Sequence, residues 1–257
     1  MKNILFRTFT SLRRNFLTFV TPEFFWPKYV NIDGVEIKIR NEPYTFGIKY
    51  SLIKQKYEGP ERNLIRNRDF YGESVIELGG SIGVLTAILS KKVGSKGMVI
   101  SVEASERISA YSRIWLEKNQ NTKVITGFGF PVLKVNDSIK VIKFDESGNS
   151  MQGNVIYMHS DESNYDKQFI YDLHKISDLF NIKTTILVAD IEGSERIIVD
   201  QKPDFPSTLK FLLIELHPEI YGKSDRDKII QRIIEERFRI TANEGNVFAF
   251  EKSEIIV

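Results

Sequence analysis

From residue 74 onward, short apolar runs of strand length alternate with segments of helical period. The predicted parallel strands are Ser74–Leu78, Met98–Val102, Lys123–Thr126, Thr185–Ala189 and Leu209–Ile214. The last two are largely apolar, which is typical of strands buried on both faces. Strands that alternate with helices predict an α/β fold with a doubly wound, mostly parallel sheet. Two further runs, Phe238–Ile240 and Val247–Phe250, flank a turn and predict an antiparallel closing strand.

The first 70 residues do not follow this alternation, so we divide the chain into residues 1–70 and residues 71–257. Residues 29–40 predict a hairpin, because Asp33-Gly34 is a turn dipeptide between alternating apolar residues. Short helices are expected on both sides of Gly59-Pro60. Residues 130–166 fit the strand–helix rhythm poorly and are interpreted as an insertion in the second part.

Residues 1–20 have the pattern of an amphipathic helix. One face carries Leu5, Phe9, Leu12, Phe16 and Phe19. Two interpretations stay open: a helix that docks on the main domain, or an interfacial helix that rests on anionic lipid. The same residues lack the compact apolar run of a secretory signal.

Composition excludes several classes of protein. The 257 residues carry a formal charge of +2, without the basic excess of a general nucleic-acid binder, so no nucleic-acid partner is expected. The absence of cysteine excludes disulfides, zinc-thiolate sites and thiol catalysis. Apolar runs are too short for a transmembrane helix. We expect a soluble cytoplasmic protein, with peripheral membrane contact through residues 1–20 as an alternative; its oligomeric state stays open.

The most informative segment runs from strand through glycine turn into helix. It reads Val75-Ile-Glu-Leu-Gly-Gly-Ser-Ile-Gly83. Ser81 stands where a dinucleotide fingerprint has its second glycine, and Glu77 places an acid at the sheet edge, which disfavours a pyrophosphate. An acid there suits a ligand with an ammonium and a sulfonium. Glu103 ends the next strand, where a carboxylate can accept hydrogen bonds from both ribose hydroxyls.

These features predict a pocket for S-adenosylmethionine. The cofactor-binding residues that we expect are Glu77, Gly79, Gly80, Ser81, Ile82, Gly83, Glu103, Ala104, Ser105 and Asp190. The alternative is a tight glycine turn with two incidental surface carboxylates.

Two more blocks follow the fourth and fifth predicted strands. They read Ala189-Asp190-Ile-Glu192-Gly193-Ser-Glu195 and Ile214-Glu215-Leu-His217. With the glycine turn, they resemble the FkbM family within the class I methyltransferases, over about residues 71–250. Gly80-Ser81 and Ala189 depart from that family's pattern. The resemblance implies a Rossmann-like methyltransferase sheet, S-adenosylmethionine as cofactor and O-methylation of a hydroxyl. The acceptor would be a small molecule, a sugar or glycan, or a glycolipid.

The expected catalytic residues are Asp190, Glu192 and His217, because ligands bind beyond the carboxyl ends of parallel strands. His217 or Asp190 would take the hydroxyl proton and Glu192 would orient the acceptor. For each of the three residues, a purely structural role is the alternative. Asp190 has a third alternative, which is contact with the cofactor. The three could ligate a divalent metal, but nothing in their spacing demands one, so no metal is predicted.

Two other functions stay open. A degenerate methyltransferase fold could serve as a binding or scaffold module, since Gly80, Ser81 and Ala189 depart from the family pattern. A nicotinamide-dependent oxidoreductase is a further alternative, against which the broken fingerprint and Glu77 argue.

Overall fold

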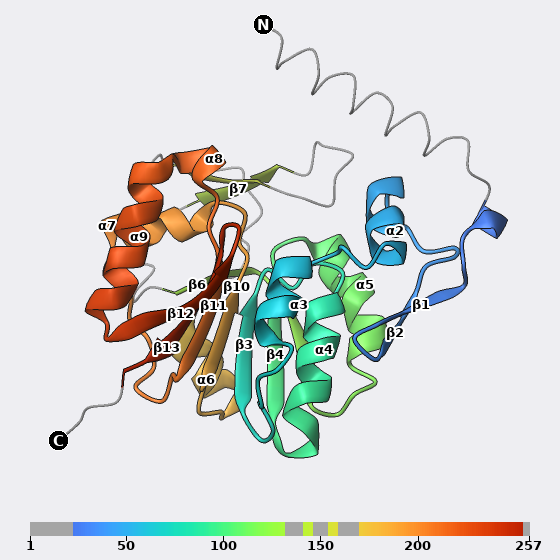
Figure 1. The fold of residues 1–257 in the computed structure, drawn as a ribbon, viewed down its shortest axis with the longest axis horizontal. Coiled ribbons are helices and arrows are strands. Elements are labelled where there is room, and N and C mark those ends of the chain that lie inside the picture. Colours follow the sequence, from blue (N-terminus) through green and yellow to red (C-terminus); the bar gives the residue numbers. More distant parts are fainter. Residues whose placement is uncertain (1–22, 132–140, 146–153, 159–169, 254–257) are drawn as a thin grey trace, which may run out of the picture.

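The computed structural model describes residues 23–131, 141–145, 154–158 and 170–253. Its centre is a seven-stranded sheet with the order β12-β13-β11-β10-β3-β4-β5 (Figure 1). The parallel strands are β3 (Ser74–Leu78), β4 (Met98–Glu103), β5 (Thr122–Thr126), β10 (Ile186–Ala189) and β11 (Phe211–Glu215). β13 (Val247–Lys252) pairs antiparallel with β11 and with β12 (Phe238–Glu244). The predicted sheet and its antiparallel closing strand are confirmed.

Side chains alternate along these strands between two apolar clusters, one on each face of the sheet. Val75 and Val188 belong to the first cluster, together with α4 (Val84–Val93). Ile76 and Leu187 belong to the second. The second cluster includes residues of α6 (Leu173–Phe180), α7 (Ile197–Asp200) and α9 (Lys223–Glu235). Because both faces are covered, the central strands β10 and β11 are apolar in nearly every position, and the fold is doubly wound.

The N-terminal segment packs on the first face. It contains η1 (Glu23–Phe25), the hairpin β1 (Tyr29–Ile32) and β2 (Val35–Lys38), α2 (Phe46–Ile53) and α3 (Gly59–Ile65). Asp33 and Gly34 both have positive φ at the hairpin turn, as the Asp-Gly dipeptide predicts. The amphipathic helix expected over residues 1–20 lies outside the described residues.

Smaller elements complete the fold. η2 (Gly94–Lys96) and α5 (Glu106–Leu116) flank β4, while η3 (Ser194–Arg196) and α8 (Pro218–Tyr221) follow β10 and β11. In the predicted insertion, β7 (Val141–Asp145) and β8 (Asn154–Met158) form an antiparallel pair. β6 (Phe128–Phe130) pairs in parallel with β9 (Ile170–Asp172) on either side of it. Among the described helices, none has the length and apolar character needed to traverse a bilayer.

Candidate active site at the carboxyl edge of the sheet

The glycine turn between β3 and α4 is shaped by close backbone contact. Gly79 and Gly83 have φ of +87°, and Ser81 between them has φ of +47°. A Cβ on Gly79 would lie 1.7 Å from the carbonyl oxygen of Asp190, and one on Gly80 would lie 1.9 Å from Ser101 Oγ. The glycines therefore let the turn approach the end of β10, which places Asp190 beside the predicted cofactor residues.

Glu103 joins the glycine turn to the start of α5. One carboxylate oxygen accepts from Ser81 N at 2.8 Å and the other accepts from Ser105 N at 2.8 Å. Ser105 in turn caps α5 by accepting from Ile108 N. Ala104 lies between them and is half-buried. Glu103, Ser81 and Ser105 thus form one hydrogen-bonded unit at the tip of β4, and their contact with a cofactor stays a prediction.

Two of the predicted cofactor residues point into the protein. Ile82 is fully buried in the first apolar cluster. Glu77 is 2% exposed and accepts a hydrogen bond from Thr86 of α4. Burial raises the pKa of Glu77 to about 7, and hydrogen bonds from Thr86 and Ser101 oppose the rise. The Glu77 side chain is thus directed into the protein and bonds to the helix that follows the glycine turn. Its direct contact with a cofactor stays a prediction.

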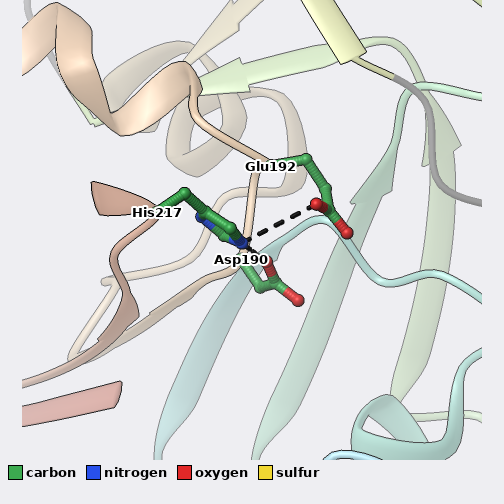
Figure 2. Close-up of side chains that lie close together, drawn as sticks. All are labelled: Asp190, Glu192 and His217. Atoms are coloured by element: carbon green, nitrogen blue, oxygen red, sulfur yellow. Dashed lines mark ion pairs between the residues drawn. The ribbon is translucent and has the colours of Figure 1, made fainter. Parts of the chain in front are cut away.

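The three expected catalytic residues lie together (Figure 2). Asp190 and Glu192 follow β10, and His217 follows β11. His217 Nε2 is 3.6 Å from Asp190 Oδ1 and 3.7 Å from Glu192 Oε2. The carboxylates are about one-third exposed, whereas the imidazole is 8% exposed. The cluster therefore offers two carboxylates to an incoming ligand, with the imidazole behind them.

Glu195 holds the imidazole from the other side. Its Oε1 lies 2.7 Å from His217 Nδ1, and its side chain is 0% exposed. The main-chain N–H of His217 donates to Tyr221 Oη of α8 at 2.7 Å. Glu195 and Tyr221 are absent from the site that the sequence predicts, although Glu195 stands in the same acidic block as Glu192. Its three-residue spacing from Glu192 is the signal that could have identified it.

Acidic groups dominate the electrostatics of this edge. Burial raises the pKa of Asp190 well above its usual range, and the neighbouring charges of Glu215 and Glu192 add to the effect. Burial lowers the pKa of His217, but the hydrogen bond and charge of Glu195, together with Asp190 and Glu192, outweigh burial and raise it to about 10. The cluster thus attracts positive charge.

The N-terminal segment contributes groups that the sequence did not reveal. Tyr57 Oη lies 3.0 Å from Ser81 Oγ, above the glycine turn. Glu58 accepts from Leu85 N at 2.9 Å, at the first turn of α4. Glu61 shares a hydrogen bond with Glu215 at the end of β11. No local pattern connects residues so far apart in the chain, so these contacts could not be inferred from sequence.

The residues present suit S-adenosylmethionine. Glu103 could accept hydrogen bonds from ribose hydroxyls, and Asp190 Oδ1 is a buried acceptor without a hydrogen-bond partner. An edge rich in carboxylates favours a ligand that carries an ammonium and a sulfonium. The same edge could hold a metal, because Asp190, Glu192 and His217 each offer a ligand atom within 4.8 Å of the others.

Comparison with known families gives a match over part of the chain. Residues 70–132 match the protein-L-isoaspartate(D-aspartate) O-methyltransferase family. The matched stretch contains β3, the glycine turn, Glu103 and Ser105. The cofactor that this match indicates is S-adenosylmethionine. The match ends before Asp190, so it does not describe the acceptor side, and the resemblance to the FkbM family stays a prediction.

The solved structures with similar folds have low sequence identity to this chain. Fibrillarin from Methanococcus jannaschii, a pre-rRNA processing protein, is 13% identical with a TM-score of 0.46, over 91% of this chain and 85% of that one. Aeropyrum pernix fibrillarin, crystallised with natively bound S-adenosyl-L-methionine, is 12% identical with a TM-score of 0.44, over 91% and 85%. An S-adenosylmethionine-dependent methyltransferase from Aquifex aeolicus is 12% identical with a TM-score of 0.38, over 74% and 87%. Comparison with curated proteins found no match.

Proposed function

We propose that this protein is an S-adenosylmethionine-dependent O-methyltransferase that acts on a hydroxyl of a sugar, glycan or glycolipid. The observation that carries the proposal is the cluster of Asp190, Glu192 and His217 at the carboxyl ends of β10 and β11, beside the glycine turn. In open α/β sheets this edge is where ligands bind. Cofactor residues and acid–base residues thus meet at one edge.

The proposed chemistry divides between the two sides of the site. S-adenosylmethionine supplies an electrophilic methyl group when bound. Glu103, Ser81 and Ser105 would hold the nucleoside part. The chain's main contribution to an in-line displacement is the positioning of the acceptor oxygen. Asp190 would take the hydroxyl proton, because the raised pKa of His217, about 10, keeps that imidazole protonated near neutral pH. Geometry favours Asp190, because its carboxylate is more exposed to an incoming acceptor than the imidazole.

The acceptor class follows from the groups that line the edge. The oxygen atoms of carboxyl groups accept hydrogen bonds, so a lining of Asp190, Glu192 and Glu215 suits an acceptor that presents several hydroxyl donors. Sugars do so. A phosphate-bearing acceptor would meet like charge here, which agrees with the expectation of no nucleic-acid partner.

Cofactor binding is the first test. Thermal unfolding is measured with S-adenosylmethionine, S-adenosylhomocysteine and NAD, on the wild type and on Glu103→Ala. A ligand at 100 times its Kd stabilises by about 2.7 kcal/mol, or roughly 5–10 °C. We expect that shift with the two adenosyl-sulfur ligands and its loss in Glu103→Ala. A shift with NAD alone would favour the oxidoreductase alternative.

Transfer is then measured with a methyl-labelled cofactor and a panel of free sugars, glycans, glycolipids and an RNA. Asp190→Asn and His217→Ala are expected to lower the rate at saturating cofactor by roughly 10²–10⁴-fold, while the control Asp200→Asn, an exposed carboxylate remote from the cluster, leaves it unchanged. Near-normal rates in both Asp190→Asn and His217→Ala would remove the catalytic assignment. Cofactor binding without transfer to any hydroxyl would favour a scaffold role.

Peripheral membrane contact through residues 1–20 is part of the proposal for a glycolipid acceptor. The pattern of that segment in the sequence supports it, since one face is apolar and the charges are basic. Sedimentation with anionic liposomes compares the full chain with a chain that lacks residues 1–20. Equal partitioning of the two chains would contradict membrane contact through residues 1–20.

A further inference from the structure

We propose that Asp190, Glu192 and His217 form a binding site for a divalent first-row metal ion. Each residue supplies one ligand atom, and the three atoms lie within 4.8 Å of one another. Ligands that share one ion at roughly 2.0–2.2 Å are at most about 4.4 Å apart. The three side chains are therefore within a small rotation of coordinating geometry.

The second observation is the state of Asp190 Oδ1. This oxygen is inaccessible to solvent and has no hydrogen-bond partner. It lies 3.6 Å from His217 Nε2, which is too far for a hydrogen bond. A buried acceptor that is left without a hydrogen bond destabilises the folded state. A cation between Oδ1, Nε2 and the Glu192 carboxylate would satisfy it, and Figure 2 shows that all three side chains converge there.

The third observation is the way in which His217 is oriented. Glu195 occupies Nδ1 at 2.7 Å from within the protein, so Nε2 is the ring nitrogen that faces the two carboxylates. Histidine ligands of metals are held in this manner, with the second ring nitrogen hydrogen-bonded to a carboxylate. Glu195 is fully buried and contributes no atom to the three-atom cluster, so it acts as a support for a ligand.

The ligand types indicate which metal fits. Carboxylates suit Mg²⁺, Ca²⁺ and Mn²⁺, whereas imidazole suits Zn²⁺, Fe²⁺, Ni²⁺ and Cu²⁺. Two carboxylates and one imidazole favour an ion that accepts both, and we use Mn²⁺ as the probe. Three protein ligands leave further positions open. If the proposed function holds, those positions would take oxygen atoms of the acceptor, so the metal assignment to this role rests on the proposed function.

The test measures Mn²⁺ binding to the full-length chain after treatment with a chelator. Loss of the signal of free Mn²⁺ in electron paramagnetic resonance gives the stoichiometry and Kd, without cofactor or acceptor. We expect one ion per chain. Asp190→Asn and His217→Ala should weaken binding at least tenfold. Glu195→Gln should weaken it roughly 10–100-fold, because Glu195 bonds to Nδ1 of the ligand His217. Asp200→Asn, an exposed carboxylate outside the cluster, is the matched control.

Thermal unfolding of each variant verifies that it is folded before its Kd is used. Absence of saturable Mn²⁺ binding, or wild-type binding by folded His217→Ala, would overturn the site; the same titration with Zn²⁺ and Mg²⁺ gives the metal preference. Failure of the metal site and failure of the proposed function are distinguishable. Methyl transfer that persists in the presence of a chelator would support the proposed function and would show that the metal takes no part in it. Saturable Mn²⁺ binding without methyl transfer to any acceptor would support the metal site and contradict the proposed function.

Discussion

Gly79 stands between the end of β3 and the main chain of Asp190, with φ of +87°. Gly245, in the turn between β12 and β13, also has positive φ, +61°, but a Cβ there would meet nothing within 4 Å. The two glycines share the backbone strain that any side chain would add, and only Gly79 also has a main-chain atom in the way.

Gly79→Ala should therefore destabilise the fold by more than Gly245→Ala. Left-handed backbone strain costs on the order of 1–3 kcal/mol at either position, and overpacking adds about 1–3 kcal/mol at Gly79 alone. Urea unfolding of both variants checks the difference. Equal losses of unfolding free energy would show that the contact between the new methyl group at residue 79 and the main chain of Asp190 adds no energetic cost.

Glu77 gives a pH dependence of stability with a definite sign. Burial raises its pKa in the folded protein to about 7 from an ordinary value of 4.5. Between these values the folded state holds the proton more tightly than the unfolded state. Stability from this group is therefore complete below about pH 4.5 and is lost as the pH rises through 7. The change is on the order of 3 kcal/mol, from a pKa that rises from 4.5 to about 7.

Glu77→Gln should flatten this part of the stability profile, because the amide keeps its hydrogen-bonding partners and does not ionise. Urea unfolding of the wild type and the variant from pH 5 to pH 8 measures the difference between them. Glu235→Gln, on the exposed side of α9, is the control and should leave the wild-type slope in place. A parallel shift of the Glu77→Gln curve, without a change in slope, would contradict the assignment.

At the scale of elements, β3 spans Ser74–Leu78 as the apolar run predicts. The following helix begins at Val84, directly after the glycine turn. The physical reason is the turn, since positive φ at Ser81 and Gly83 delays the helix. Residues 128–130 pair with residues 170–172 across the insertion. That pairing depends on a distant partner, and no periodicity in either segment indicates it.

The same limit applies to the candidate site. Asp190, Glu192 and His217 were predictable because each follows an apolar strand, and parallel strands bring their carboxyl ends to one edge. Glu195 and Tyr221 lie on short helical turns whose orientation depends on packing. Glu58 and Glu61 reach the edge from the N-terminal segment, which local sequence cannot place.

Glu58 supplies a prediction at this scale. Its carboxylate accepts from Leu85 N and so satisfies a main-chain donor in the first turn of α4, for which Gly83 has no side chain to offer. Glu58→Ala should lower the unfolding free energy by about 1 kcal/mol, the usual cost of a lost cap. Glu58→Gln keeps an acceptor oxygen and should lose less. Equal losses in urea unfolding at pH 6 would show that the hydrogen bond to α4 contributes nothing.

At the scale of the whole molecule, the N-terminal segment and the sheet share one apolar cluster. Ile32, Ile37 and Leu52 are at most 2% exposed and belong to the cluster that contains Val75 and Leu85. Arg68 adds polar links, since it pairs with Glu251 and donates to Thr241 Oγ1 at 3.0 Å. The sequence places a boundary near residue 71, and the contacts across it are those of a common core.

A chain that begins at residue 71 should therefore fail to fold cooperatively. Its sheet would expose the apolar face that α2, α3 and the β1–β2 hairpin cover, and each large apolar side chain left uncovered costs about 1.5–3 kcal/mol. Three such side chains already approach the total stability of an ordinary domain, about 5–15 kcal/mol. A chain that begins at Glu23 keeps the described contacts and is the matched control, expected to unfold in one cooperative transition. Calorimetry of the two chains tests this prediction. A cooperative transition of the chain from residue 71, near the midpoint of the control, would contradict it. The N-terminal segment would then be an appendage, and the contacts of Tyr57, Glu58 and Glu61 with the site would not be needed for the fold.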